Sequence, residues 1–311
     1  VGTWNKGVSF YKNEGSRKEP DFVLVDTTFV KLTRGSNSTP ALADLDGDGD
    51  LDLFIGESSG ELNFYRNIGT PQEPSFELVT DKFQDIDAGR RSFPAFADMN
   101  GDGKDDLLIG AFYADSSSSA IDSGIQYVIF GKSKSEFGTS VALTDLNGTD
   151  GFRLDGEATW DFAGWSVSTA GDVNGDGYDD IVIGEPRGHN TGIPHAYIYY
   201  GKSEGYSSEV DLDALNGSNG FALAGSAGSH LGTSVSSAGD MNGDGYDDLI
   251  IGSPYTDLHP RAPLQIDFAA PLASSPGEAW VIFGKASNFS ANTALTSLDD
   301  TEGFRIEGID A

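Results

Sequence analysis

The stretch DVNGDGYDD, residues 172–180, holds four aspartates in nine residues and runs directly into Ile181, Val182 and Ile183. Carboxylates placed this close together repel one another. The stretch is therefore either a solvated turn or a loop that encloses a cation. The pattern recurs three more times, as DLDGDGDLD from Asp44, DMNGDGKDD from Asp98 and DMNGDGYDD from Asp240.

These acidic stretches mark an internal repeat. Each copy is followed by an apolar strand pattern, LFIG, LLIG, IVIG or LIIG, and three copies are then followed by YVIFGKS, YIYYGKS or WVIFGKA. A repeat of roughly 50–70 residues with about four short strands is typical of a blade of a β-propeller, in which neighbouring blades bury each other's faces. We expect an all-β fold of four-stranded blades in one domain over residues 1–311, with approximate units at 1–31 (partial), 36–80, 90–143, 151–213, 220–296 and 303–311 (partial).

The acidic stretches fit the pattern D-x-[DN]-x-D-G-x-x-D, which supplies the hard oxygen ligands that Ca²⁺ prefers. Glycine at position 6 permits a sharp turn. Position 7 offers its backbone carbonyl, so its side chain is free to vary. An EF-hand needs an acidic residue at position 12, where these copies have isoleucine. Mg²⁺ is less suitable because it requires a small octahedral site.

We therefore predict about four Ca²⁺ ions, one in each loop. A plain solvated turn would also contain Asp, Asn and Gly, but it does not require five oxygen-bearing positions in fixed phase four times over. The expected side-chain ligands are Asp44, Asp46, Asp48, Asp52, Asp98, Asn100, Asp102, Asp106, Asp172, Asn174, Asp176, Asp180, Asp240, Asn242, Asp244 and Asp248. The expected backbone-carbonyl ligands are Asp50, Lys104, Tyr178 and Tyr246.

The composition excludes several classes of partner. The formal net charge is −30 and the pI is near 4.1, so we expect no nucleic-acid partner, since phosphate binding needs clustered Lys and Arg. No apolar stretch is long enough to span a bilayer, and we expect no direct membrane insertion. Without cysteine there are no disulfides and no thiolate metal sites.

The loops and the strands that follow them resemble the FG-GAP repeats of the β-propeller of integrin α-subunits. The FYKN and FYRN strands near the N-terminus resemble the related VCBS-type repeats. The resemblance implies an extracellular, seven-bladed ring that binds calcium, of which this chain would hold four whole units and two partial ones. The family's Phe-Gly reads Ala163-Gly164 and Leu231-Gly232 here, and its Gly-Ala-Pro reads Gly184-Glu185-Pro186.

Other candidate motifs have simpler explanations. Residues 115–119, DSSSS, match a D-x-S-x-S metal motif, but that site belongs to a different, Rossmann-like domain. The histidines, His189, His195, His230 and His259, show no metal or catalytic spacing, and there is no G-x-S-x-G. We therefore predict no catalytic residues. The tryptophans are expected to pack between blades rather than to stack on sugars: Trp4, Trp160, Trp165 and Trp280.

Hairpin topology places three connections on the face opposite the acidic loops: residues 112–124, 185–192 and 254–278. Loops on a rigid scaffold often carry binding functions. Four N-x-[ST] sequons, at Asn37, Asn147, Asn216 and Asn288, are glycosylation candidates.

The resulting expectation is a secreted or cell-surface module for adhesion or for binding a protein or glycan. Two alternatives stay open. One is a non-catalytic propeller that belongs to a secreted polysaccharide- or lipid-degrading enzyme, and the other is a purely architectural array.

Overall fold

The computed structural model describes residues 1–308 apart from 4–6, 17–18, 33–34, 45–48, 71–72, 133–139, 189–191, 255–276 and 287–288. The described residues form an all-β structure whose helical segments are single 3₁₀ turns: η1 (Phe83–Asp85), η2 (Leu143–Asp145), η3 (Leu212–Ala214) and η4 (Leu295–Ser297). Within this described part, no helix is long and apolar enough to cross a membrane.

Four antiparallel four-stranded sheets make up most of the fold. The first contains β3 (Thr39–Ala43), β4 (Asp52–Gly56), β5 (Leu62–Asn67) and β6 (Phe76–Thr80). The second contains β7 (Phe93–Ala97), β8 (Asp106–Ala111), β9 (Ile125–Ile129) and β10 (Gly151–Asp155). The third contains β11 (Ser166–Gly171), β12 (Asp180–Glu185), β13 (His195–Tyr199) and β15 (Gly220–Ala224). The fourth contains β16 (Ser234–Gly239), β17 (Asp248–Ser253), β18 (Glu278–Ile282) and β20 (Gly303–Glu307).

Four further strands complete the described structure. A hairpin of β1 (Val8–Asn13) and β2 (Phe22–Val30) precedes the first sheet. Two short strands, β14 (Glu209–Asp211) and β19 (Asn292–Ala294), pair in parallel with β10 and β15 and so extend the preceding sheets. The divisions between sheets fall at different residues from the repeat units, because β10 hydrogen-bonds to β9 and therefore closes the second sheet.

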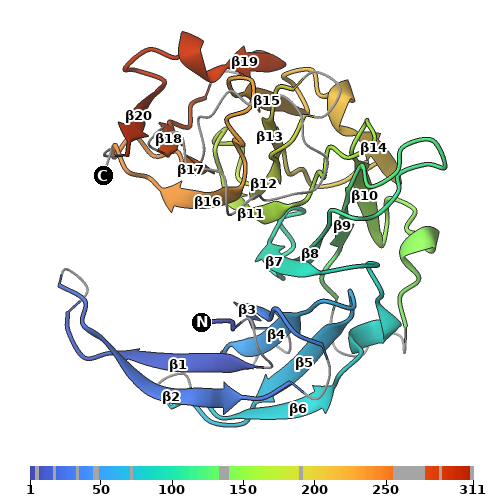
Figure 1. The fold of residues 1–311 in the computed structure, drawn as a ribbon, viewed down its shortest axis with the longest axis vertical. Coiled ribbons are helices and arrows are strands. Elements are labelled where there is room, and N and C mark those ends of the chain that lie inside the picture. Colours follow the sequence, from blue (N-terminus) through green and yellow to red (C-terminus); the bar gives the residue numbers. More distant parts are fainter. Residues whose placement is uncertain are drawn as a thin grey trace, which may run out of the picture.

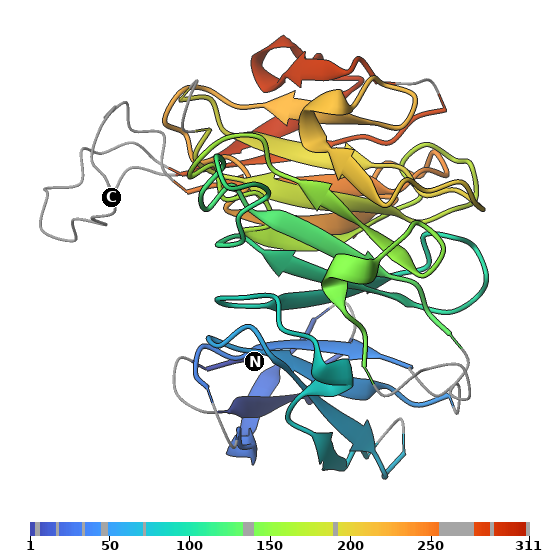
Figure 2. The same cartoon turned by 90° about the vertical axis from the view of Figure 1, so that its right-hand side faces the viewer.

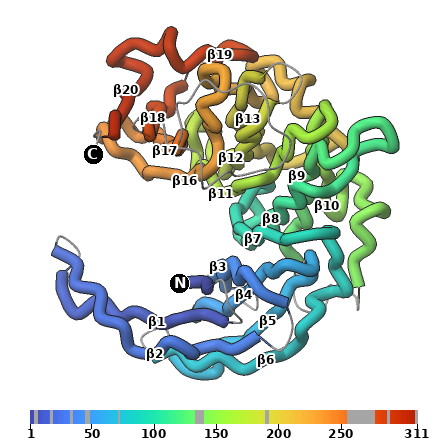
Figure 3. The backbone as a smooth tube through the Cα atoms, in the orientation of Figure 1, coloured from blue at the N-terminus to red at the C-terminus, as the bar shows by residue number. Residues whose placement is uncertain are grey.

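The sheets follow one another around an arc, with β3, β7, β11 and β16 on its inner side (Figure 1). The arc is open between the β1–β2 hairpin and β20. The backbone tube shows the same order of sheets (Figure 3). In the view turned by 90°, the sheets succeed one another from the N-terminal to the C-terminal part, with connections at both edges (Figure 2). This arrangement is that of β-propeller blades, as the repeat predicts.

Packing between sheets explains why the second strand of each blade is continuously apolar. Ile181 and Ile183 of β12 lie in the core shared with the second sheet, while Val182 lies in the core shared with the fourth. Successive side chains of a strand point to opposite faces, so a strand buried on both faces has no polar alternation. The blades therefore bury their faces against their neighbours.

Candidate metal centre

The four acidic loops lie at one edge of the blades. Each joins the first strand of a four-stranded sheet to the second: β3 to β4, β7 to β8, β11 to β12 and β16 to β17. Position 9 of each loop is the first residue of the second strand. The bulges that precede two of the loops, at Gly171 and Gly239, bend the first strand just before its loop begins.

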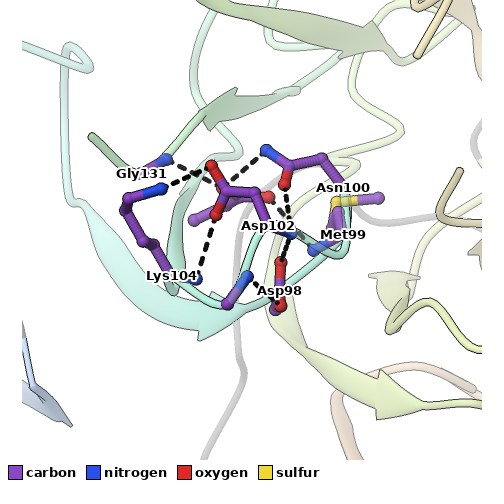
Figure 4. Close-up of polar contacts among 8 residues, drawn as sticks. Asp98, Met99, Asn100, Asp102, Lys104 and Gly131 are labelled. Carbon is purple, nitrogen blue, oxygen red and sulfur yellow. Dashed lines mark hydrogen bonds and ion pairs between the residues drawn. The ribbon is translucent and has the colours of Figure 1, made fainter. Parts of the chain in front are cut away.

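The loop at 98–106 turns its side-chain oxygens inward (Figure 4). The Asp98 carboxylate accepts hydrogen bonds from the backbone N–H of Asp102 at 3.1 Å and of Gly103 at 2.9 Å. The Asn100 side-chain oxygen accepts from the same Asp102 N–H at 2.9 Å. The side-chain oxygens of positions 1 and 3 therefore face the same N–H, while the position-5 carboxylate accepts from Lys104 N–H at 3.0 Å.

The two C-terminal loops repeat this geometry. Asp172 accepts from the N–H groups of Asp176 at 3.0 Å and Gly177 at 2.9 Å, and Asp240 accepts from those of Asp244 at 3.0 Å and Gly245 at 2.9 Å. In the first loop Asp44 accepts from Gly49 N–H at 3.0 Å. Asp46 and Asp48 of that loop lie outside the described residues.

The aspartate at position 9 has a second role that the motif alone does not reveal. Asp180 is fully buried, and its carboxylate accepts from Val173 N–H at 3.1 Å and from Gly201 N–H at 2.9 Å. It thus ties the start of its loop to the end of the third strand of the same blade. Asp52, Asp106 and Asp248 are buried in the same way and likewise accept from the backbone at or just beyond the end of that third strand.

Burial changes the protonation of two of these carboxyls. It raises the pKa of Asp106 to about 7 and that of Asp180 to about 8, against the lowering effect of their backbone hydrogen bonds. Nearby loop aspartates contribute to the rise. Without a compensating cation, these two carboxyl groups are therefore protonated to a large extent at neutral pH.

Position 7 differs among the loops, and its side chains make contacts that the sequence did not predict. Lys104 places its Nζ 2.8 Å from the Asp102 carboxylate, so a cationic side chain already pairs with position 5 of its own loop. A Cβ on Gly101 would lie 2.7 Å from the Tyr178 ring, and one on Gly175 would lie 2.3 Å from the Tyr246 ring. The two tyrosines therefore pack against the loop of the preceding blade.

Position 8 joins neighbouring loops to each other. Asp98 N–H donates to the Asp179 carboxylate at 3.1 Å, and Asp179 N–H donates to the Asp98 carbonyl at 3.2 Å. Asp172 and Asp247 make the same pair of bonds, at 3.0 and 3.2 Å. We refer to these bonds, together with the tyrosine packing, as the loop-to-loop contacts. Through them the third and fourth blades each fix the first expected ligand of the blade before them.

The comparisons with known proteins agree with this repeat geometry. A family model described as "FG-GAP-like repeat" matches residues 44–109, and one described as "FG-GAP repeat" matches residues 163–197 and 231–263. The chain is 31% identical over 219 residues to Integrin alpha-PS2 of Drosophila melanogaster, an alignment that covers 66% of this chain and 13% of that protein.

Human Integrin alpha-IIb is 30% identical over 225 residues, which cover 67% of this chain and 20% of the relative. The mouse protein of the same name is 32% identical over 166 residues, covering 51% and 14%. The chain is an FG-GAP repeat protein that resembles integrin α-subunits. It spans one fifth or less of the length of these relatives.

The glycines that remain in the FG-GAP motifs meet between blades. A Cβ on Gly184 would lie 2.0 Å from the carbonyl oxygen of Gly232, and one on Gly110 would lie 2.4 Å from that of Gly164. Gly164 and Gly232 occupy the Phe-Gly position, and Gly184 occupies the Gly-Ala-Pro position. The two motif glycines therefore permit the close approach of adjacent blades.

The other motif candidates of this FG-GAP chain lie at the opposite edge, in the core between blades or outside the described residues. Asp115 of the D-x-S-x-S stretch accepts from Asp122 N–H at 2.7 Å within the β8–β9 connection. Trp165 is partly buried beside Phe112 and Phe162, and Trp280 packs against the core between the third and fourth sheets. Trp160 is 38% exposed. His189, His259, Trp4, Asn288 and most of residues 254–278 are outside the described part.

One histidine contacts a buried carboxyl group. His195 Nδ1 lies 3.4 Å from Glu185 Oε1, and Glu185 is 3% exposed. Burial raises the pKa of Glu185 to about 7, and the charge of Asp161 adds to the rise, while His195 and Tyr197 lower it. His230 lies elsewhere on this edge, and burial lowers its pKa, with the charge of Arg187 acting in the same direction.

We expect the stability of Glu185→Gln, relative to that of the parent, to increase as pH rises. A carboxyl whose pKa is raised on folding adds stability below its unfolded pKa near 4.5, and this stability is lost as pH rises through the folded value near 7. Relative to the parent, the variant should gain about 2 kcal/mol between pH 5 and pH 8. Urea unfolding in chelator at both pH values measures this, and an equal difference at both would contradict it.

Proposed function

We propose that this FG-GAP chain is a calcium-binding, extracellular β-propeller that serves as an adhesion or ligand-binding module. The observation that carries the proposal is the repeated loop geometry in a chain that resembles integrin α-subunits. High acidity and the lack of cysteine are compatible with a surface or secreted protein stabilised by metal rather than by disulfides.

The donor set of the loops fits calcium. Side-chain oxygens at positions 1, 3 and 5, the position-7 carbonyl and the position-9 carboxylate would hold the ion, and six to eight oxygen ligands are what Ca²⁺ takes. Bound calcium would offset the clustered negative charge and cross-link the turn to the strand. The raised pKa values of Asp106 and Asp180 support this fit, because buried carboxylates favour a nearby cation.

The opposite edge is the proposed ligand face for a protein or glycan. Among its described residues, Ile121 is 50% exposed and Trp160 is 38% exposed, and Trp160 N–H donates to the Ile121 carbonyl at 2.8 Å. Nearby, Arg187 lies 5.0 Å from the centre of the Phe162 ring. Exposed aromatic and aliphatic side chains beside arginine are typical of binding surfaces.

The proposed module is not an enzyme. The resemblance is to integrin α-subunits, and no motif of the sequence supplies a nucleophile with its base. Two alternatives make different predictions. A non-catalytic propeller of a polysaccharide- or lipid-degrading enzyme would bind polysaccharide or lipid, and a purely architectural array would bind no ligand.

The test is a binding screen of the purified chain against extracellular matrix proteins and glycans, in calcium and in chelator. Ile121→Ser should weaken the binding of a ligand found in the screen about tenfold. This is the effect of losing a side chain that contributes roughly 1.4 kcal/mol to the binding free energy. The matched control is Ile68→Ser, since Ile68 is 59% exposed and follows β5 at the calcium edge. Binding to none of the probes would favour the architectural array, and equal losses in both variants would contradict the proposed face.

A further inference from the structure

Two short strands clasp neighbouring blades together. β14 leaves the third blade and pairs in parallel with β10 of the second, and β19 leaves the fourth and pairs with β15 of the third. We call these pairings the first and the second clasp. Because β10 and β14 run away from the acidic loops, the ends of the first clasp lie at the opposite edge of the blades.

The first clasp brings like charges together. Its register places Asp155 beside Asp211 and Arg153 beside Glu209. Carboxylates directly opposite each other on neighbouring strands are destabilising. One oxygen from each of Asp155, Glu209 and Asp211 lies within 4.8 Å of the others. The register therefore concentrates three carboxylates around one point.

The buried member of this group lacks a full set of partners. Asp155 is 4% exposed. Its Oδ2 lies 3.1 Å from Arg153 Nη2, but its enclosed Oδ1 has no hydrogen-bond partner within the described ranges of the chain. Buried carboxylate oxygens are normally satisfied. The orphaned oxygen is an observation separate from the clustering, and a bound cation would give it a partner.

Arg153 neutralises only part of the charge. The same Nη2 atom that contacts Asp155 lies 2.7 Å from Glu209 Oε2, so one guanidinium serves two carboxylates while Asp211 adds a third. Burial raises the pKa of Asp155 to about 7. The charges of Glu209 and Asp211 and a side-chain hydrogen bond with Glu209 add to the rise, against the lowering effect of Arg153. Two negative charges remain uncompensated when all three carboxyls are ionised.

The second clasp shows that the fold does not need these charges. In its register, Ala222 pairs with Asn292 and Ala224 pairs with Ala294, so the equivalent positions are neutral. The parallel pairing forms in both cases. The carboxylates of the first clasp are therefore an addition to the clasp and not a requirement of it.

We propose that Asp155, Glu209 and Asp211 form a divalent-cation site, separate from the four loops and at the opposite edge of the blades. Three carboxylates favour a hard cation such as Ca²⁺, Mn²⁺ or Mg²⁺. The ion balances the two charges that Arg153 leaves and supplies a partner for the orphaned Asp155 oxygen. Its effect is to fasten β14 to β10 and so to hold the third blade against the second.

Counting bound Mn²⁺ by electron paramagnetic resonance tests the site. Asp211→Asn should bind about one ion fewer per chain than the parent at saturating Mn²⁺. Asp240→Asn should lower the count through a loop, and the double variant should show both losses, so failure of the loops and failure of the clasp are distinguishable. An unchanged count in Asp211→Asn would overturn the proposal.

Thermal unfolding gives a second readout that does not depend on counting. In chelator, Asp211→Asn should unfold at a higher temperature than the parent, because it removes a like-charge contact. In excess Mn²⁺ the order should reverse, since only the parent binds the ion at the clasp. If the variant keeps its advantage in Mn²⁺, Arg153 alone neutralises the clasp and the proposal fails.

Discussion

Removal of calcium with excess chelator is expected to lower the midpoint of thermal unfolding by roughly 10 °C. At free calcium of ~10 times Kd, each loop adds about 1.4 kcal/mol, and four loops add on the order of 5–6 kcal/mol. In a chain of this size, each kcal/mol moves the midpoint by about 2 °C. Calorimetry or circular dichroism with calcium and then with chelator measures the shift.

Two controls sharpen this experiment. Magnesium at the same concentration should produce a much smaller rise, because the loops offer a large and flexible oxygen site. Asp172→Asn, which alters position 1 of a fully described loop, should reduce the calcium response by about a quarter if the sites contribute equally. If the midpoint of thermal unfolding does not change with calcium, the loops are solvated turns.

The substitution Gly184→Ala is expected to destabilise the chain by at least about 3 kcal/mol. The new Cβ would lie 2.0 Å from the carbonyl oxygen of Gly232 in the next blade. A backbone atom cannot rotate away as the end of a side chain can, so the two blades must separate. Overpacking of this kind typically costs about 1–3 kcal/mol and sometimes more. Urea unfolding, with its midpoint and slope, measures the loss.

The matched control is Gly252→Ala in the following blade. Gly252 occupies the equivalent position in the repeat, but the only described atom within 3 Å of its Cβ would be the flexible Ser234 hydroxyl, at 2.3 Å. This variant should lose much less stability than Gly184→Ala. Equal losses would show that the approach of the next blade is not the reason that glycine is needed at this position.

The sequence predicted the features that depend on local pattern. The acidic loops, their place between two strands and the β-propeller class all follow from short motifs repeated at a regular interval. The oxygens of Asp98 and Asn100 that face one N–H group follow from alternation within one turn. These features are recoverable because the residues that determine them lie within about ten positions of each other.

Features that depend on pairing between distant segments left no readable signal. The parallel clasp of β14 onto β10 joins residues more than fifty positions apart, and the sequence EVD alone does not indicate its partner. The repeat pattern therefore predicts a unit that begins at residue 151, whereas the strand Gly151–Asp155 closes the preceding sheet. The contacts of Asp179 and Tyr178 with the preceding blade were missed for the same reason.

The loop-to-loop contacts have a consequence for how such a chain can be rearranged. Because Tyr178 and Asp179 complete the loop of the preceding blade, the unit that must stay intact is the junction between two repeats and not a single repeat. Deletion, duplication or grafting of a blade would preserve its own motif yet separate a loop from the residues that hold its first aspartate. Designed chimaeras of this protein should therefore exchange segments that begin before one loop and end after the next, so that both loops of the junction stay together.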